Sequence, residues 1–465
     1  MGQTPNERLR DYLAKLPPQS QALLMREFER AVERGEDTTI ATLVLEHLRK
    51  VVRGTPESAA PRSEDAVRLL FRPLEPFIVE GSLPVRAGQI RRAALMPVWQ
   101  WLLRDGGPEQ TREYQTELAR ILENADDATL ESAVRKMQFA AAAAILKIAS
   151  PSGGDNHRAL ARVGPPEVVE DLFAIGSVLQ AHEALDALGA RLPMYLRTFD
   201  EMQVSSVCAA LNVPTLQTPQ LLPFALSLVI QRLAAPWHII RIAIKMAASD
   251  DGIRVAATPY GIAVSLALHD LFCLATQLRM DIRRGQLANV GANLKALHDG
   301  VRGLRTEIDL RQDSHWGKQL ASIRAEISNT LQSEIDSVPG RVRRILRQRA
   351  DKDISPGARV DTSEVEEVVA LIDFVAVCRT YASELAINEV TLRTYSDLQH
   401  YVEQATEALV QSLRGGETKA RAYRQMQAEA AISFCDVLFG REYSTLMRRA
   451  VENAVVVERK PSRAG

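Results

Sequence analysis

The sequence predicts an all-α protein, a multi-helical array built around a buried central helical pair. Ala, Leu, Arg and Glu, which favour helices, are abundant, whereas the Val/Thr/Tyr alternation typical of strands is scarce. Apolar side chains recur every three or four residues along most of the chain, which is the spacing of a helix with one buried face. In the C-terminal half the spacing becomes almost heptad-like, so we expect long helices there.

The composition is that of an ordinary globular protein and argues against two classes of partner. Of the 465 residues, 46% are apolar, 25% are charged and 5% are aromatic, and the formal net charge is −1. A chain with almost no net charge has no overall field that would attract nucleic acid or acidic lipid. Contact with either partner would therefore have to be local.

The cysteines predict neither disulfides nor zinc ligation. Cys208, Cys273, Cys378 and Cys435 are far apart, and no C-x-x-C spacing occurs. This distribution is typical of reduced core residues in a cytosolic protein. The first residues have no apolar core after a basic start, so we expect no secretory signal and a cytoplasmic location.

Residues 1–54 are predicted to form a small N-terminal helical module, followed by a linker at 55–63 that is rich in turn-forming residues. The module has two apolar stripes, and it is close to the lower size limit for a domain that folds alone. We therefore expect the stripes to bind a second copy of the chain or a different protein. The candidate interface residues are Leu23, Leu24, Phe28, Leu43, Leu45 and Leu48.

Residues 64–190 are predicted to be a helical region. Four prolines between positions 73 and 97 divide its first part into several short helices, and cleaner helices are expected at 111–124, 128–149 and 168–188. The glycine-rich segment 150–156 lacks the G-x-x-x-x-G-K-[ST] pattern of a phosphate loop, so we interpret it as a turn.

Residues 191–456 are predicted to form the body of the protein, with the central pair at 219–284. Leu221–Ile230 is almost continuously apolar, and the second helix, from residue 262, is apolar on two faces. Such a helix is usually buried between neighbours. The uncharged run 203–231 contains three prolines, which interrupt it too often for a spanning helix of ~20 apolar residues.

The next segment, 287–308, has the most regular apolar spacing in the chain, with alternating steps of three and four residues. Gly291, Gly300 and Gly303 lie on its flanks, although each glycine inside a helix costs ~1 kcal/mol. We favour close packing against another part of the same chain, with a dimer seam as the alternative. The seam residues are Leu287, Val290, Leu294, Leu297, Val301, Leu304 and Ile308.

Further helices are predicted after a break at 312–314. The first should end at Pro339-Gly340, and the next should begin with a capping box of Ser363 and Glu366. Another helix is expected to end at Gly415-Gly416, and two more precede a disordered tail at 457–465.

Two Leu-His-Asp triplets, at 268–270 and 297–299, are the only pattern that resembles a catalytic motif. A His-Asp doublet on a helix can hold a metal ion that activates water, and in this respect the chain resembles the HD-type phosphohydrolases. The resemblance implies His238, His269, Asp270 and Asp299 as metal ligands, with Asp309 as a substitute for Asp299. The alternative interpretation is a set of buried, hydrogen-bonded histidines, which we favour.

A basic cluster at 341–352 is the sharpest concentration of charge. It could form an amphipathic helix on anionic membrane or nucleic acid, although it lacks the aromatic residues that stack on bases. The interpretation we favour is a solvated helix paired with acids such as Glu364, Glu366 and Glu367. The basic candidates are Arg341, Arg343, Arg344, Arg347, Arg349 and Lys352.

These observations favour a non-catalytic cytosolic scaffold, adaptor or regulatory subunit that binds a protein partner, or a second copy, through helix faces. No G-x-S-x-G, H-E-x-x-H or kinase motif occurs, and no cofactor or resident metal is predicted. The alternatives are the metal-dependent phosphohydrolase and attachment of the basic helix to membrane or nucleic acid.

Overall fold

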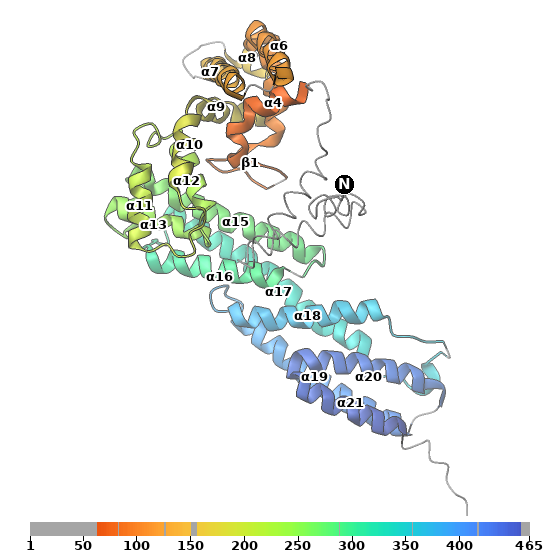
Figure 1. Cartoon of the computed structure of the whole chain (residues 1–465). Helices are drawn as coiled ribbons and strands as arrows, with labels where there is room; N and C mark the ends of the chain where they lie inside the picture. Colours follow the sequence, from red (N-terminus) through yellow and green to blue (C-terminus); the bar gives the residue numbers. More distant parts are fainter. Residues whose placement is uncertain are drawn as a thin grey trace, which may run out of the picture. The chain divides into compact units, whose positions relative to one another are not determined.

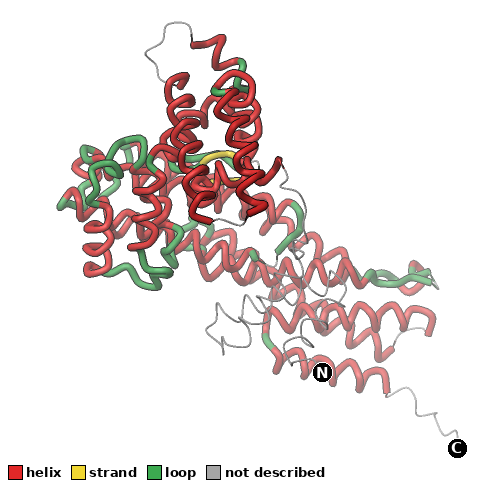
Figure 2. Tube along the Cα trace, turned by 45° about the horizontal axis from the view of Figure 1, so that its top comes forward, coloured by secondary structure: helices red, strands yellow, loops and turns green. Residues whose placement is uncertain are grey.

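The computed structural model describes residues 63–81, 83–124, 127–149, 156–287, 289–355, 357–415 and 418–456. These residues form 18 α-helices, α4 to α21, and a single pair of two-residue strands. The predicted all-α class is therefore confirmed (Figures 1 and 2). The N-terminal module, nearly all of the linker and the tail lie outside the described residues.

The chain divides into two compact units, which are interleaved along the sequence. The described part of the first comprises residues 63–69, 110–124 and 127–136. It therefore contains most of α4 (Ser63–Phe71) and α6 (Pro108–Asn124) and the start of α7 (Asp127–Ala149). Tyr114 on α6 is buried and donates a hydrogen bond to the Ala66 carbonyl of α4 at 3.2 Å.

The second unit begins with short elements, as the prolines predict. They are η1 (Arg72–Phe77), β1 (Ile78–Val79), β2 (Ile90–Arg91), η2 (Arg92–Ala94), α5 (Leu95–Trp101) and the π-helical η3 (Leu102–Gly106). The strands pair in parallel, with Ile78 opposite Ile90. Two residues are too few to produce a strand pattern in the sequence, so the pair was not predicted.

The helix predicted at 168–188 is instead two helices. After α8 (Asn156–Ala161), α9 (Pro166–Gln180) and α10 (His182–Arg191) are separated by a single residue, Ala181. The imidazole Nδ1 of His182 lies 2.8 Å from the Leu179 carbonyl, which the turn leaves without its helical partner. The interruption leaves the apolar period intact, so the sequence pattern runs through it.

The central pair is confirmed as a buried core, but its first member is broken. Its segments are α12 (Leu222–Ile230), η4 (Pro236–Ile239), α13 (Ile240–Ala247) and α14 (Gly252–Ala256). After η5 (Pro259–Gly261), α15 (Ile262–Arg283) is continuous, as predicted. Every residue of α12 is buried. Burial on all sides gives no helical period, which is why the ends of the first member were not predicted.

The segment 191–219, which precedes the central pair, contains one helix that the sequence analysis does not predict. α11 (Glu201–Leu211) begins with a capping box in which the Gln203 backbone donates to the Asp200 carboxylate at 3.0 Å. The signal D-x-x-Q is present in the sequence and was overlooked.

α16 (Val290–Glu307) carries the regular seam, and its glycines lie where other side chains approach. A Cβ atom on Gly300 would lie 2.5 Å from Leu271 Cδ2 of α15, and one on Gly303 would lie 2.4 Å from the ring of Trp237 in η4. Neither distance is tolerated by a real Cβ. The glycines therefore admit neighbours from the same chain, which is the interpretation the sequence favoured.

The C-terminal helices are long and regular. They are α17 (His315–Leu346), α18 (Thr362–Tyr381), α19 (Asn388–Gly415), α20 (Thr418–Phe439) and α21 (Arg441–Val456), with the short η6 (Asp351–Asp353) after α17. The predicted break at 312–314 is confirmed, because Ser314 caps α17 by accepting from the Gly317 backbone at 3.0 Å.

Two predictions in this region are wrong. Pro339 does not end α17, which continues to Leu346 because the buried stripe of Val338, Val342 and Ile345 stays in register across it. The cap of α18 is Asp361, which accepts from the Ser363 backbone at 2.9 Å, and not Ser363 itself. An Asx cap two residues earlier satisfies the same free amide groups.

Among the described residues, one helix is long and apolar enough to cross a membrane by length and composition. It is Pro259–Arg283, with a mean hydropathy of 1.5 in its most apolar window, of which 56% is buried inside the protein. A buried core helix of a soluble protein meets the same criteria of length and apolar composition. The sequence pattern points to 203–231 as the membrane-span candidate and not to this helix, whose two apolar stripes indicate packing surfaces.

Candidate functional site

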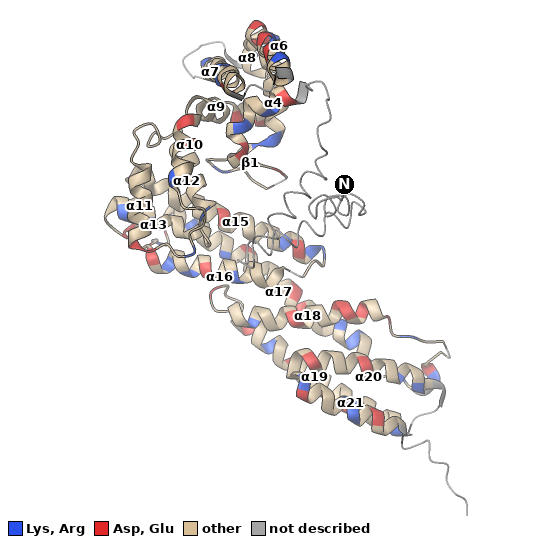
Figure 3. Cartoon of the chain, in the orientation of Figure 1, with Lys and Arg blue, Asp and Glu red and all other residues tan. Residues whose placement is uncertain are grey.

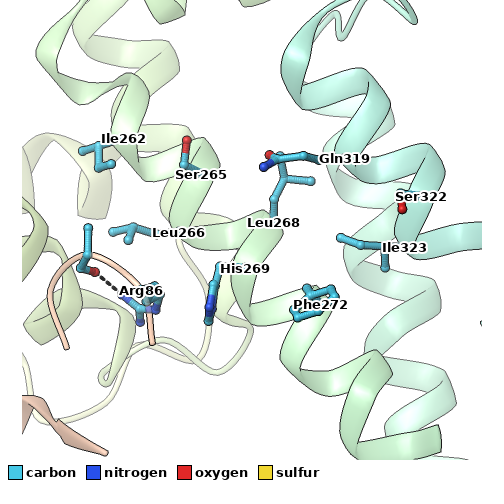
Figure 4. A pocket seen from close by; sticks show the side chains of 11 residues that line it. Arg86, Ile262, Ser265, Leu266, Leu268, His269, Phe272, Gln319, Ser322 and Ile323 are labelled. Carbon is cyan, nitrogen blue, oxygen red and sulfur yellow. Dashed lines mark hydrogen bonds between the residues drawn. The ribbon is translucent and has the colours of Figure 1, made fainter. Parts of the chain in front are cut away.

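A cavity of about 470 Å³ lies in the second unit, between α15, α17 and the loop that precedes β2 (Figure 4). Most of its wall is apolar, and a few polar groups reach into it. The apolar side chains are Ala87, Ile262, Leu266, Leu268, Phe272 and Ile323, and the polar ones are Arg86, Ser265, His269, Gln319 and Ser322. A pocket of this size and character is typical of small-molecule sites.

Arg86 is the charged group of this wall, and it is largely buried, with 8% of its side chain exposed. Its Nε donates to the Asp270 carboxylate at 3.0 Å, and its Nη1 donates to the Ser227 hydroxyl at 2.8 Å. Ser227 in turn donates to the Pro223 carbonyl of α12 at 2.8 Å. These bonds fix the guanidinium between α12 and α15.

Gly88 holds the Arg86 loop against α12. Its φ is +81°, in the region that favours glycine, and a Cβ at this position would lie 2.4 Å from the Pro223 carbonyl oxygen. No other residue type allows the loop to approach α12 so closely. Gly88 therefore helps to position Arg86, two residues earlier, by allowing the loop backbone to lie against α12.

Next to Arg86, His269 and Cys273 are in contact one turn apart on α15. The thiol sulfur lies 3.4 Å from His269 Nδ1. Burial and the nearby Arg86 charge lower the pKa of His269, whereas burial and the Asp270 charge raise the pKa of Cys273. Both shifts favour the neutral forms, so the pair is not a thiolate and an imidazolium, the form that nucleophilic cysteines require.

Asp270 is not available as a metal ligand in this arrangement. Burial raises the pKa of its carboxyl, although the ion pair and hydrogen bond with Arg86 act in the opposite direction. Its Oδ1 accepts a hydrogen bond from the Arg86 guanidinium. Asp270, the acid of the His-Asp doublet that suggested a metal site, is therefore the partner of Arg86 in an interior ion pair.

The other predicted metal ligands are not gathered around Asp270. The His238 ring lies against that of Trp237 in η4, with ring centroids 4.1 Å apart and the planes tilted by 60°. Asp299 is exposed on α16, and the Asp309 carbonyl accepts from the Gly252 backbone at 3.1 Å. His298 packs against Tyr381. Within the described ranges, no three His, Cys, Asp or Glu side chains form a group that could hold a metal ion.

The basic cluster is not one helix, because α17 ends at Leu346 and leaves Arg347, Arg349 and Lys352 beyond it. The acid pairing that the sequence favoured is present, because Arg341 pairs with Glu367. Basic and acidic positions occur together on the C-terminal helices (Figure 3). Three further interactions involve the same helix end. They are the ion pairs Arg341–Glu334 at 3.7 Å and Arg344–Glu364 at 3.4 Å, and the stacking of Arg343 over Tyr401 at 5.6 Å.

A second candidate feature is an exposed apolar edge, here termed the methionine edge and defined as Met194, Tyr195, Met202 and Met246. Met194 is 80% exposed and Met202 is 77% exposed. The side chains come from the loop after α10, from α11 and from α13, and α11 and α13 lie side by side (Figure 1). Half of the large exposed apolar side chains of the described residues lie between positions 194 and 253.

The loop of the methionine edge is fixed to the chain below it. The Leu196 backbone donates to the Arg232 carbonyl at 2.7 Å, and the Ala234 backbone donates back to Leu196 at 3.0 Å. Arg241 on α13 donates to the Phe199 carbonyl at 2.6 Å. The exposed side chains are therefore carried by a fixed backbone.

The sequence analysis identified His269 and Asp270 but missed Arg86, Cys273 and the methionine edge. The i, i+4 spacing of His269 and Cys273 on a predicted helix was a usable signal. Arg86 lies 184 residues from Asp270 in sequence, so no local pattern indicates the pair. The candidate interface residues of the N-terminal module lie outside the described residues.

Comparison with known proteins assigns no family to this chain. No protein-family model matches the sequence, no curated protein is significantly similar to it, and no solved structure matches its fold.

Proposed function

We propose that the protein is a non-catalytic cytoplasmic adaptor or scaffold that binds another protein through the methionine edge. The observation that carries this proposal is the exposure of Met194, Tyr195, Met202 and Met246 on adjoining segments of a fixed backbone. Large apolar side chains that remain exposed together mark interaction surfaces. The partner surface that fits them is an apolar face, such as one side of an amphipathic helix.

Methionine suits this role because its side chain is unbranched and polarisable and adapts to different partner shapes. Tyr195 adds an aromatic ring with a polar end, a residue type that is enriched in interfaces. The ion pair of Glu201 with Lys245, 3.7 Å apart, joins α11 to α13 beside these side chains. The edge therefore combines an adaptable apolar centre with a polar border.

The catalytic alternative receives less support from the geometry. Asp270 is paired with Arg86, and the neighbouring His269 and Cys273 favour their neutral forms. The membrane or nucleic-acid alternative rests on the basic cluster, whose Arg341 and Arg344 are paired with acids. Paired guanidinium groups contribute less to an anionic surface than free ones.

Site-specific crosslinking in cells tests the proposal. A photoreactive benzoyl-phenylalanine replaces Met202, and a matched control carries the same residue at Arg448, which is exposed on α21. We expect a discrete protein adduct from position 202 that is absent from position 448 and that disappears when Met194 and Met246 are changed to Ser. Equal adducts from both positions, or none from position 202, would contradict the proposal.

The predicted N-terminal module is a second interface, and it is tested separately. Deleting residues 1–62 should leave the remaining chain helical by circular dichroism but remove self-association or the recovery of one partner. Light scattering and quantitative co-purification of both forms measure this. If the full chain is monomeric and both forms recover the same partners, the module has no role in association.

A further inference from the structure

We propose that the cavity between α15 and α17 is a binding site for an uncharged, largely apolar small molecule held through a carbonyl or ester oxygen. This inference concerns a different surface from the methionine edge and does not depend on the adaptor function. It rests on three properties of the cavity. Its walls are apolar, two of its hydrogen-bond donors have no acceptor among the described residues, and its one cationic side chain is balanced by a carboxylate.

The walls favour an apolar ligand body. Leu268 from α15 and Ile323 from α17 line the part of the cavity between the two helices, where Phe272 also lies, and Leu266 lines the part next to Arg86 (Figure 4). The volume of about 470 Å³ lies within the range of ligand pockets. A cavity with such walls gains free energy when an apolar molecule displaces the water inside it.

Two polar groups of the cavity, Arg86 and Ser265, have hydrogen-bond donors that meet no acceptor among the described residues. Arg86 directs Nε and Nη1 at Asp270, Ser227 and the Ala87 carbonyl, while none of the described residues accepts from its Nη2. The Ser265 hydroxyl accepts from Trp316 Nε1 at 3.0 Å, and its own hydrogen has no acceptor among the described residues. Both donors belong to residues that line the cavity and are open to a ligand, so the site favours a ligand that brings an acceptor oxygen.

The charge balance favours an uncharged ligand. The Arg86 charge is matched by Asp270, and a ligand carboxylate on the same guanidinium would lie close to that carboxyl group. A ligand ammonium would instead be repelled by Arg86. His269 lies beside Arg86 (Figure 4), and its lowered pKa keeps it uncharged at neutral pH, so it adds no charge that would alter this balance.

Calorimetric titration of the full chain with three probes of the same chain length tests the proposal. The probes are methyl decanoate, decanoate and decylamine. We expect methyl decanoate to bind with one molecule per chain, and the two charged probes to bind at least about tenfold more weakly. Tighter binding of decanoate than of the ester would overturn the assignment of an uncharged ligand.

Variants on α17 show whether binding occurs in this cavity. Ser322 is exposed at the cavity wall, so Ser322→Trp should obstruct the cavity without disturbing the core and weaken methyl decanoate binding at least about tenfold. Asn329→Trp, two turns further along the same helix face and outside the cavity wall, is the matched control and should bind normally. Unchanged binding by Ser322→Trp, or no binding by the parent protein, would refute the proposal.

The role of Arg86 is tested by Arg86→Lys, which keeps the charge beside Asp270 but removes Nη2. We expect methyl decanoate to bind about tenfold more weakly, with circular dichroism unchanged. If this variant does not fold, the comparison of Ser322→Trp with Asn329→Trp still decides the proposal. Parent-like affinity in a folded Arg86→Lys would contradict the donor role of Nη2.

Discussion

The region around α15, residues 192–307, differs from the C-terminal helices α17 to α21 in how it buries its apolar side chains. The former packs helices as short as 5 residues, joined by 3-10 turns, around one helix of 22 residues. The latter uses helices of 16 to 32 residues. The methionine edge and part of the α15–α17 cavity lie in the region of short helices. The comparison indicates that the candidate binding features accompany the irregular backbone.

The largest expected effect concerns α15 itself. Leu278 is fully buried, so Leu278→Ala should lower the free energy of unfolding by ~2–5 kcal/mol, because it leaves a cavity in a packed core. Leu446→Ala on α21, where the side chain is 58% exposed, is the matched control and should change it by less than ~0.5 kcal/mol. Chemical denaturation measures both. Similar midpoints for the two variants would mean that α15 is not the core of its region.

The second effect contrasts an interior ion pair with a surface one. Asp270→Asn leaves the largely buried Arg86 without its counter-charge and should cost ~1–3 kcal/mol of unfolding free energy. Asp336→Asn removes an exposed partner of Arg393, 3.6 Å away, and should cost ~1 kcal/mol or less. Equal costs in denaturation experiments would show that the Arg86 pair is solvated like a surface pair.

A smaller effect concerns pH. Burial lowers the pKa of both His238 and His269 in the α15-centred region. The unfolded chain therefore takes up protons at a higher pH than the folded chain, and stability that is present above about pH 6.5 is lost as the pH falls through the folded pKa. In the double variant His238→Gln/His269→Gln, the melting temperature should fall less on acidification from about pH 7.5 to 5.5. An identical fall in parent and variant would argue against buried neutral histidines.

Regular spacing was the reliable guide to the fold. The seam of 287–308 and the stripe of α17 were predicted because one helix face is buried continuously, and that period survives even Pro339. The breaks within the central pair were not predicted, because α12 is buried on every side and shows no period. The cap at Asp200 was readable and was overlooked.

The candidate site was less predictable than the fold. His269 and Asp270 were noticed as a doublet, but their chemistry is set by Arg86, which only tertiary structure brings to them. The glycines of α16 are the exception, because their cost in a helix predicts the close neighbours that Leu271 and Trp237 supply.

The central claim is that the α15-centred region is held together by close contacts within one chain, and two glycine substitutions test it most directly. Gly303→Ala places a Cβ atom 2.4 Å from the Trp237 ring, whereas Gly340→Ala on α17 has no neighbour within 4 Å. Their unfolding free energies, measured by chemical denaturation, should change in opposite directions. We expect Gly303→Ala to lose ~1–3 kcal/mol through overpacking and Gly340→Ala to gain up to ~1 kcal/mol through helix propensity. A gain in both variants would contradict the account, because it would mean that Trp237 does not pack against α16.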